Sequence, residues 1–307
     1  MNSWQPGADR ETLKQRAQLL SAIRSFFAER QVLEVQTPLL TPAGVSDPHI
    51  ESLQITGLDG YLRTSPEYFH KRLLAAKLGD LYEMGPVFRG SEQGRLHRTE
   101  FLLLEWYRVG WTWQRLAEEV CEMILHCAAS LGTDGYQIQW RAWTDCFTEL
   151  GVEPLTASET ELRALVPELV GTTDRDSLLD YLFAGHIQPR LPAKALSIVH
   201  HYPASQAALA RLDPEQPELA QRFEVFIGPV ELANGYQELA CPSEQRLRFE
   251  QDNRRRDALG LPAMPMDEAL LQALTAGLPD CAGVALGVDR LLMALLGLDR
   301  IDLGCAF

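Results

Sequence analysis

This chain of 307 residues lacks an excess of positive charge, paired cysteines and long uninterrupted apolar runs. Its 28 lysines and arginines are outnumbered by 42 aspartates and glutamates, which gives a formal net charge of −14 at pH 7. A broad contact with a nucleic-acid backbone needs a basic surface, so the composition disfavours an obligate nucleic-acid binder. The three consecutive arginines at 254–256 are expected on the solvated face of a helix.

The cysteines and the apolar segments exclude further classes of protein. None of the six cysteines belongs to a Cys-x-x-Cys pair, so we expect reduced thiols and no zinc site. The most apolar run, residues 284–298, is interrupted by Asp289 and Arg290 and is too short to cross a bilayer. The N-terminal residues also lack the apolar stretch of a signal peptide. We therefore expect a soluble, cytoplasmic protein with no membrane partner.

The order of the periodic segments predicts an α+β fold. Helices are expected at residues 10–30, 67–76, 114–130, 246–259, 266–276 and 288–296. Strands are expected at residues 32–35, 50–58, 61–64, 81–88, 101–107, 195–201 and 223–239. Short turns between consecutive strands favour a sheet of about six mostly antiparallel strands flanked by helices. We expect one domain over residues 1–307, with residues 141–190 as a helical insertion.

The segment from Phe88 to Tyr107 carries the densest cluster of charged side chains. Arginines and a histidine alternate there with Glu92, Glu100 and Glu105 before the chain becomes apolar. A strand, loop and strand of this kind can present guanidinium groups to a polyphosphate and carboxylates to an ammonium group. Structural ion pairs are the alternative interpretation of this cluster.

Three glutamates, Glu224, Glu231 and Glu238, recur at intervals of seven residues. Gly228-Pro229 predicts a turn between two strands, and a bulge at Asn234-Gly235 would bring Glu231 and Glu238 to one face. Converging carboxylates repel one another unless a cation is present, and Mg²⁺ or a substrate ammonium group would serve. A charged edge hairpin is the alternative.

The third segment, Gly283 to Arg290, predicts a strand rich in small residues that runs into a helix. Small side chains let a flat ring or a phosphate approach the backbone, and Arg290 can reach a terminal phosphate. An ion pair between Asp289 and Arg290 at the start of the helix is the simpler interpretation. A Rossmann or P-loop fold is rejected, because no glycine-rich turn joins a strand to a helix in the required context.

Together these segments resemble the class II aminoacyl-tRNA synthetases. Residues 35–38 (VQTP) resemble motif 1, residues 88–105 resemble motif 2, and residues 283–290 resemble motif 3. Residues 64–68 (TSPEY), 104–107 (LEWY) and 231–238 (ELANGYQE) resemble the lysine-specific members. We expect no anticodon-binding domain before residue 10. The chain is therefore similar to the freestanding paralogues of lysyl-tRNA synthetase that ligate (R)-β-lysine to translation elongation factor P, a likeness that extends to residues 3–6, 203–206 and 248–254.

The resemblance implies an ATP-dependent, AMP-forming ligase that uses Mg²⁺ and works as a homodimer through motif 1, with tRNA an improbable partner. The residues that it makes catalytic are Arg89, Arg290 and Glu231. Those that it assigns to ATP are Arg89, Glu92, His97, Arg98, Phe101, Glu231, Leu232, Gly287 and Arg290. Those that it assigns to (R)-β-lysine or lysine are Ser65, Pro66, Glu67, Glu105, Tyr107, Glu238 and Ala285. Those that it assigns to the metal are Glu224 and Glu231.

Three departures from the synthetase pattern bear on these roles. Arg98-Thr99 replaces the common Asn-Pro of motif 2, and Gly90-Ser91 offset the acidic residue Glu92 from Arg89. Ala285 stands where lysyl-tRNA synthetases have glycine. One methyl group in a pocket is worth ~1–3 kcal/mol, which is enough to disfavour α-lysine relative to β-lysine. A truncated synthetase that acts on tRNA and a non-catalytic, lysine-sensing paralogue remain as alternatives.

Overall fold

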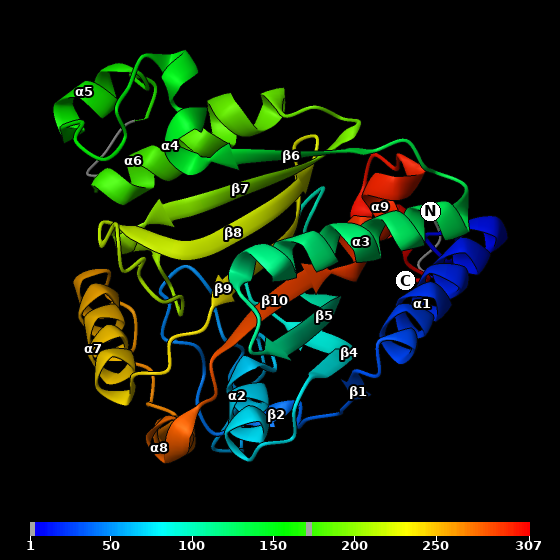
Figure 1. Cartoon of the computed structure of the whole chain (residues 1–307), viewed down its shortest axis with the longest axis horizontal. Coiled ribbons are helices and arrows are strands. Elements are labelled where there is room, and N and C mark those ends of the chain that lie inside the picture. The colour runs from blue at the N-terminus through cyan, green and yellow to red at the C-terminus, as the bar shows by residue number, and fades with distance from the viewer. Residues whose placement is uncertain (1–3, 170–173) are drawn as a thin grey trace.

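The computed structural model describes residues 4–169 and 174–307, and within them the chain forms a large sheet with helices around it (Figure 1). The sheet has eight strands in the order β1-β4-β5-β10-β9-β8-β7-β6, and a separate two-stranded sheet pairs β2 with β3. The strands are β1 (Leu33–Glu34), β2 (Leu40–Thr41), β3 (Tyr61–Leu62), β4 (Leu81–Phe88), β5 (Glu100–Val109), β6 (Gln137–Ala142), β7 (Ala195–Pro203), β8 (Leu219–Ile227), β9 (Val230–Gln237) and β10 (Cys281–Gly287).

The sheet is mixed rather than uniformly antiparallel. Its six central strands, from β4 to β7, pair antiparallel, as the short turns predicted. The two outer strands pair parallel to their neighbours, β1 to β4 and β6 to β7. Strand β6 was missed because its residues fall partly in the segment expected to be helical, and because it leaves Ile138 and Trp140 exposed at the edge of the sheet.

The helices outside residues 141–190 form where the sequence predicted them, and short helices occupy part of that segment, which was expected to be helical. They are α1 (Arg10–Glu29), α2 (Glu67–Ala75), α3 (Trp113–Leu131), α4 (Trp143–Cys146), α5 (Glu159–Ala164), α6 (Arg175–Leu182), α7 (Pro242–Ala258), α8 (Glu268–Gly277) and α9 (Val288–Leu296). Local capping sets the ends of α1 and α3. The Asp9 carboxylate accepts a hydrogen bond from the Thr12 N–H at the start of α1, and Gly132 ends α3 with a φ of +70°.

Helices α1, α3 and α9 cover one face of the large sheet (Figure 1). Alternate residues of the strands, including Leu104 and Trp106 of β5, point into this core. The Phe27 ring stacks on Tyr82 with a centroid distance of 4.3 Å. Because one face of the sheet is filled in this way, the alternate residues of β5, β9 and β10 face the opposite side.

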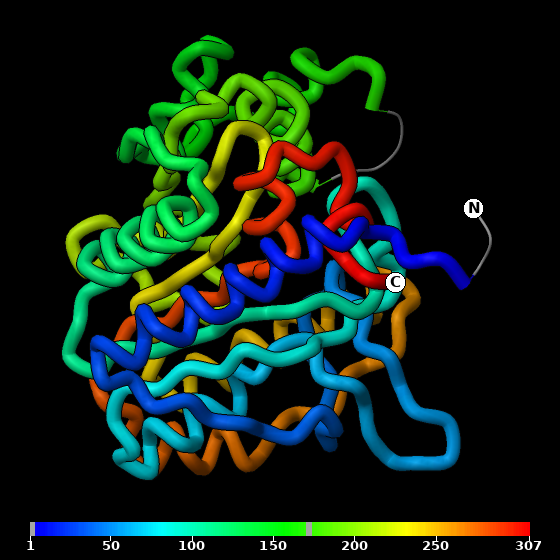
Figure 2. The backbone as a smooth tube through the Cα atoms, turned by 90° about the vertical axis from the view of Figure 1, so that its right-hand side faces the viewer, coloured from blue at the N-terminus to red at the C-terminus, as the bar shows by residue number. Residues whose placement is uncertain are grey.

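Residues 7–8 lie beside residues 305–306, close to the loop between β4 and β5 (Figure 2). The Gly7 N–H donates to the Ala306 carbonyl at 2.9 Å, and the Ile301 N–H donates to the Arg95 carbonyl at 2.9 Å. The C-terminal segment therefore supports the loop that carries the motif 2 arginines.

The segment between β6 and β7 contains α4, α5 and α6 and packs around its own apolar cluster, which includes Trp143, Phe147 and Leu178. This cluster adjoins the main sheet through Tyr202 and Phe226. Residues 170–173 of this segment, like Ser3 of the N-terminal motif, lie outside the described residues. Its status as an insertion within a single domain stays a prediction.

Two local expectations need correction. Residues 50–64 turn at Asp59-Gly60 as a hairpin, but its first strand is reduced to the antiparallel bridge from Gln54 to Tyr61, with the Leu62 N–H donating to the Leu53 carbonyl at 2.9 Å, and β3 pairs instead with β2. The arginines at 254–256 are not all solvated, because Arg256 is buried and donates a hydrogen bond to the Pro262 carbonyl at 2.8 Å. No helix within residues 4–169 and 174–307 has the length and apolarity that a membrane crossing demands.

Candidate active site

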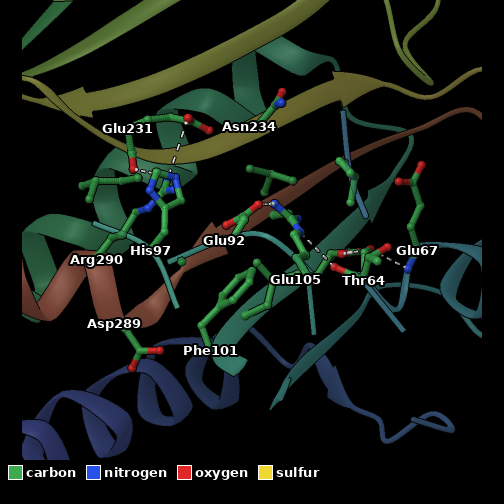
Figure 3. Close-up of a pocket in the computed structure, with 18 of the residues that line it drawn as sticks. Thr64, Glu67, Glu92, His97, Phe101, Glu105, Glu231, Asn234, Asp289 and Arg290 are labelled. Atoms are coloured by element: carbon green, nitrogen blue, oxygen red, sulfur yellow. Dashed lines mark hydrogen bonds and ion pairs between the residues drawn. The ribbon is translucent and has the colours of Figure 1, made fainter. Parts of the chain in front are cut away.

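A cleft of about 200 Å³ lies on the face of the large sheet opposite α1 and α3, with Arg290 from the first turn of α9 at one end (Figure 3). Its floor consists of alternate residues from the three central strands β5, β9 and β10. The loop between β4 and β5 and the start of α2 supply its walls. The predicted site residues that line it are Ser65, Glu67, Arg89, Glu92, His97, Arg98, Phe101, Glu105, Tyr107, Glu231, Leu232, Glu238, Ala285, Gly287 and Arg290.

A bulge in β9 brings its acidic residues to this floor. The register shifts where Glu231 pairs with Phe226 while Ala233 pairs with Val225, so the extra residue is Leu232. The predicted bulge at Asn234-Gly235 was therefore misplaced, although its expected consequence holds. Glu231 and Glu238 both line the cleft.

One end of the cleft, which we call the cationic end, contains Arg89, His97 and Arg290. Figure 3 shows Arg290 and His97 beside Glu231. Arg290 donates to the Glu231 carbonyl at 3.3 Å, and its guanidinium lies 3.6 Å from the Glu231 carboxylate. Burial lowers the pKa of His97, and the neighbouring Arg290 lowers it further. This histidine is therefore a neutral group beside two permanent cations.

Arg89 and Phe101 complete the cationic end. The Arg89 guanidinium lies 5.2 Å from the centre of the Phe101 ring and 3.7 Å from the Glu92 carboxylate. Its Nε donates a long hydrogen bond of 3.4 Å to the Thr64 carbonyl. These contacts are weak, so the guanidinium can reorient toward phosphate oxygens without losing a strong partner.

The other end, the carboxylate end, contains Glu67, Glu105 and Glu238. Glu105 is buried and accepts hydrogen bonds from the Ser65 hydroxyl at 2.7 Å and the Tyr107 hydroxyl at 2.8 Å. Glu67 and Glu238 both contact Lys71 of α2, whose Nζ lies 2.6 Å from Glu67 Oε1 and 2.7 Å from Glu238 Oε2. Three carboxylates thus converge on a space that suits one or two ammonium groups.

A second layer of buried charge supports the carboxylate end from below. His70 lies between Glu105, at 3.3 Å, and Glu83, at 3.1 Å, and Arg63 forms an ion pair with Glu83 at 2.7 Å. Burial opposes the charged form of His70, but the adjacent Glu105 and Glu83 carboxylates raise its pKa. Burial alone would raise the pKa of Glu83, whereas hydrogen bonds from His70, Thr37 and Arg63 lower it to about 2.

Two small residues of β10 shape the floor. Ala285 pairs with Glu105 on one side and Asn234 on the other, so its methyl group lies between the two ends of the cleft. Gly283 allows no side chain, since a Cβ there would lie 2.3 Å from Glu238 Oε1 and 2.3 Å from the Tyr107 ring. The glycine therefore permits Glu238 and Tyr107 to approach each other.

Two predicted residues lie apart from this lining. Pro66 caps the start of α2 and does not line the cleft. Glu224 lines an adjoining cavity of about 540 Å³, where it accepts a hydrogen bond from the Tyr202 hydroxyl at 2.7 Å and pairs with Arg222. Burial raises the pKa of Glu224 to about 7, Arg222 opposes this, and the negative charge of Glu231 adds to it. A shared metal role for Glu224 and Glu231 stays a prediction.

Several residues of the site were not predicted. Thr64, Asn234 and Tyr236 line the cleft, and Lys71 lies behind it. Asn234 could have been identified from its position between Glu231 and Glu238 once the bulge was placed. Lys71 carried only the signal of a helix pair, since it follows Glu67 by four residues, and such pairs usually lie on solvated surfaces.

The comparison with protein families agrees with this geometry. The sequence profile of the class II tRNA synthetases (D, K and N) matches residues 6–307. The chain therefore belongs to the class II tRNA synthetases.

Curated relatives narrow this assignment. The elongation factor P–(R)-β-lysine ligase of Proteus mirabilis (strain HI4320) is 45% identical, over 99% of this chain and 97% of the relative. The ligase of the same name from Vibrio parahaemolyticus is 45% identical over 99% of this chain and 98% of its own length. The ligase from Edwardsiella ictaluri is 45% identical over 100% of this chain and 98% of its own length. Within its class, the chain shares a family with these ligases.

Proposed function

We propose that this protein is an ATP-dependent ligase that activates (R)-β-lysine as an aminoacyl-adenylate and transfers it to a lysine side chain of elongation factor P. The observation that carries the proposal is one cleft with a cationic end and a buried carboxylate end. Such a cleft suits a nucleotide and a diamino acid held end to end. The printed names of the relatives support the choice of acyl group and acceptor.

In the first step, a carboxylate oxygen of (R)-β-lysine attacks the α-phosphorus of ATP and pyrophosphate leaves. Arg89 contacts the α-phosphate and offsets the negative charge that develops there. Arg290 holds the γ-phosphate, and the Phe101 ring stacks on adenine. Glu92, His97, Arg98, Leu232 and Gly287 complete the nucleotide contacts.

Glu231, together with Glu224, would hold Mg²⁺. Glu231 fits this role, because its side chain is 38% exposed in the cleft and its carboxylate lies 3.6 Å from the Arg290 guanidinium. Glu224 would have to exchange a partner for the ion, because its carboxylate is paired with the Tyr202 hydroxyl and Arg222 in the adjoining cavity. Carboxylates are ligands that Mg²⁺ accepts in nucleotide sites. The ion would offset the charge of the phosphates.

In the second step, the neutral amine of the acceptor lysine attacks the acyl carbon and releases one proton to solvent. An isopeptide bond forms, the bond between the acyl carbon and the phosphate oxygen breaks, and AMP leaves with its electron pair. The enzyme contributes orientation, because the carboxylate end fixes both ammonium groups of the substrate and so fixes the acyl carbon. Neither step requires a covalent bond to the enzyme.

The Ala285 methyl group supports a preference for the β-isomer. It lies on the floor beside Glu105, where the substrate backbone passes. The amine of β-lysine is one carbon further from the carboxylate than that of α-lysine. A methyl group that obstructs the α-amine would leave the β-amine free.

A homodimer through motif 1 is also proposed. Leu33, Leu39 and Leu40, on either side of residues 35–38, are each at least 40% exposed. Such a concentration of exposed leucines next to an edge strand suits a buried contact with a second copy. The net charge of −14 supports a protein acceptor over tRNA.

The experiment that tests the function follows the acceptor. The enzyme is incubated with ATP, Mg²⁺ and (R)-β-lysine, together with unmodified elongation factor P or bulk tRNA, and each acceptor is analysed by mass spectrometry. One lysyl-sized increment on the protein and none on tRNA is the expected result. A mass increment on tRNA alone would instead identify a truncated synthetase. If neither acceptor gained mass and ATP was not consumed, the protein would be a lysine sensor.

A further inference from the structure

Lys71 of α2 is a fully buried cation behind the carboxylate end of the cleft. Its side chain is 0% exposed, and it does not line the cleft, although both of its carboxylate partners do. A lysine is rarely buried to this extent unless its charge is paired. Here the Nζ is paired twice, with Glu67 of the same helix and with Glu238 at the end of β9.

We propose that Lys71 is a positioning residue, which holds Glu67 and Glu238 as ionised, correctly aimed acceptors for the two ammonium groups of a diamino acid. The proposal rests on the proposed function, from which it takes the lysine-type substrate. It adds a residue that contacts the substrate only through its two partners.

The geometry divides the oxygens of the two carboxylates. Lys71 contacts Oε1 of Glu67 and Oε2 of Glu238, which leaves the second oxygen of each outside this ion pair. Because α2 fixes Lys71 and Glu67 four residues apart, one cation ties the helix to the strand at a set distance. The spacing between the two acceptors therefore depends on the lysine.

The charges around Lys71 explain why a cation is needed there. Glu105 and Tyr107 of β5, Tyr236 of β9, Cys281 of β10 and the α2 residues Tyr68 and His70 are the other titratable groups that face this cluster. Of these, Glu105 carries negative charge that discourages ionisation of its neighbours. Burial raises the pKa of Glu67 and of Glu238, and Lys71 lowers both.

Removal of Lys71 therefore favours protonation of the two glutamates. A protonated carboxyl group is a poorer acceptor for an ammonium group than a carboxylate. The defect should weaken as the pH rises, since a higher pH restores the carboxylates.

The test is ATP–pyrophosphate exchange driven by (R)-β-lysine in the Lys71→Met variant. We expect KM for (R)-β-lysine to rise at least about tenfold, with KM for ATP changed less than about threefold, because one buried charge pair is worth that much or more. Between pH 7 and 9 the KM profile of the variant should shift toward higher pH relative to the wild type. Lys14→Met, which removes an exposed lysine paired with Glu11 on α1, is the matched control and should leave both KM values unchanged.

A second pair of variants keeps the test independent of folding. If Lys71→Met does not fold, Lys71→Gln replaces it, since an amide can still donate to a carboxylate but carries no charge. Lys71→Arg, which keeps the charge, should recover at least part of the loss in KM. A folded, neutral variant with an unchanged or lower KM for (R)-β-lysine, or with an unshifted pH profile, would overturn the proposal. Failure of the wild type to catalyse exchange with any lysine isomer would instead contradict the proposed function.

Discussion

The cationic end and the carboxylate end of the cleft hold their charged side chains in different ways. At the cationic end, Arg89 and Arg290 are a fifth to a quarter exposed, and their nearest carboxylates lie 3.7 and 3.6 Å away. At the carboxylate end, Lys71 is 0% exposed, and its two carboxylate contacts are 2.6 and 2.7 Å long. The charged groups of the cationic end are partly exposed and loosely paired, whereas Lys71 at the carboxylate end is buried and tightly paired.

The difference follows from what each end would bind. A polyphosphate brings several negative charges, so the arginines need only be available, and strong partners would compete with the phosphates. A diamino acid brings two ammonium groups on a flexible chain, and discrimination between isomers needs acceptors that are fixed beforehand. Buried carboxylates can be held in this way only if buried cations neutralise part of their charge.

The largest expected effect is that of Arg89→Ala on catalysis. Loss of a group that stabilises developing charge should lower the rate of ATP–pyrophosphate exchange by about 10²- to 10³-fold. The melting temperature should change little, because the contacts of Arg89 are long. Arg115→Ala, at an exposed site on α3, is the control. A variant that lost stability in proportion to activity would contradict the idea of a loosely held cationic end.

Glu105→Gln should act on the carboxylate end of the cleft and change KM for (R)-β-lysine. It removes the charge that pairs with His70 but keeps the shape, and we expect KM for (R)-β-lysine to rise about 30- to 100-fold, equivalent to roughly 2–3 kcal/mol. KM for ATP should stay within about twofold. Initial rates at varied concentrations of each substrate measure both constants, with the exposed Glu118→Gln as the control. An equal rise in KM for (R)-β-lysine and KM for ATP would mean that the two ends of the cleft do not bind their ligands independently.

Ala285→Gly probes the point where the two ends meet. Removal of the methyl group should improve kcat/KM for α-lysine relative to (R)-β-lysine by about 10-fold or more, within the 10- to 200-fold range of a single methylene contact. Competition between the two isomers in the exchange reaction measures this ratio. If the ratio of kcat/KM values were unchanged, residues other than Ala285 would determine the preference for (R)-β-lysine.

Glu83→Gln should have the smallest effect on catalysis and a visible one on stability. The pKa of Glu83 is lowered to about 2 in the folded chain, below that of an unfolded glutamate near 4.3. Its ionised form therefore stabilises the fold above pH ~4.3, and this contribution is lost as the pH falls toward 2. The variant should unfold more easily at pH 7 but lose less additional free energy of unfolding between pH 5 and 3. Denaturant titrations at pH 7, 5 and 3 measure the free energy of unfolding of both proteins. If that free energy changed equally with pH in the variant and in the wild type, Glu83 would not support the carboxylate end as described.

The cationic end was more predictable from the sequence than the carboxylate end. Arg89 and Arg290 stand in motifs whose glycines and alternating apolar residues fix the strands, and both line the cleft as expected. The place of the bulge at Leu232 depends on the pairing of β8 with β9, which no local pattern reveals. Lys71 was missed because a Glu-Lys pair on a helix has the same sequence whether it is solvated or buried. The direction of β6 depends on the path of residues 143–194, which lacks a clear periodicity.

The most direct test of the account is ATP–pyrophosphate exchange by the wild-type protein with (R)-β-lysine, α-lysine and 6-aminohexanoate offered separately. The carboxylate end is built for two ammonium groups, so exchange should be fastest with (R)-β-lysine, slower with α-lysine by about tenfold or more, and slowest with 6-aminohexanoate, which has only one. Exchange at equal rates with all three compounds, or with none, would contradict the claim that this cleft selects and activates a β-diamino acid.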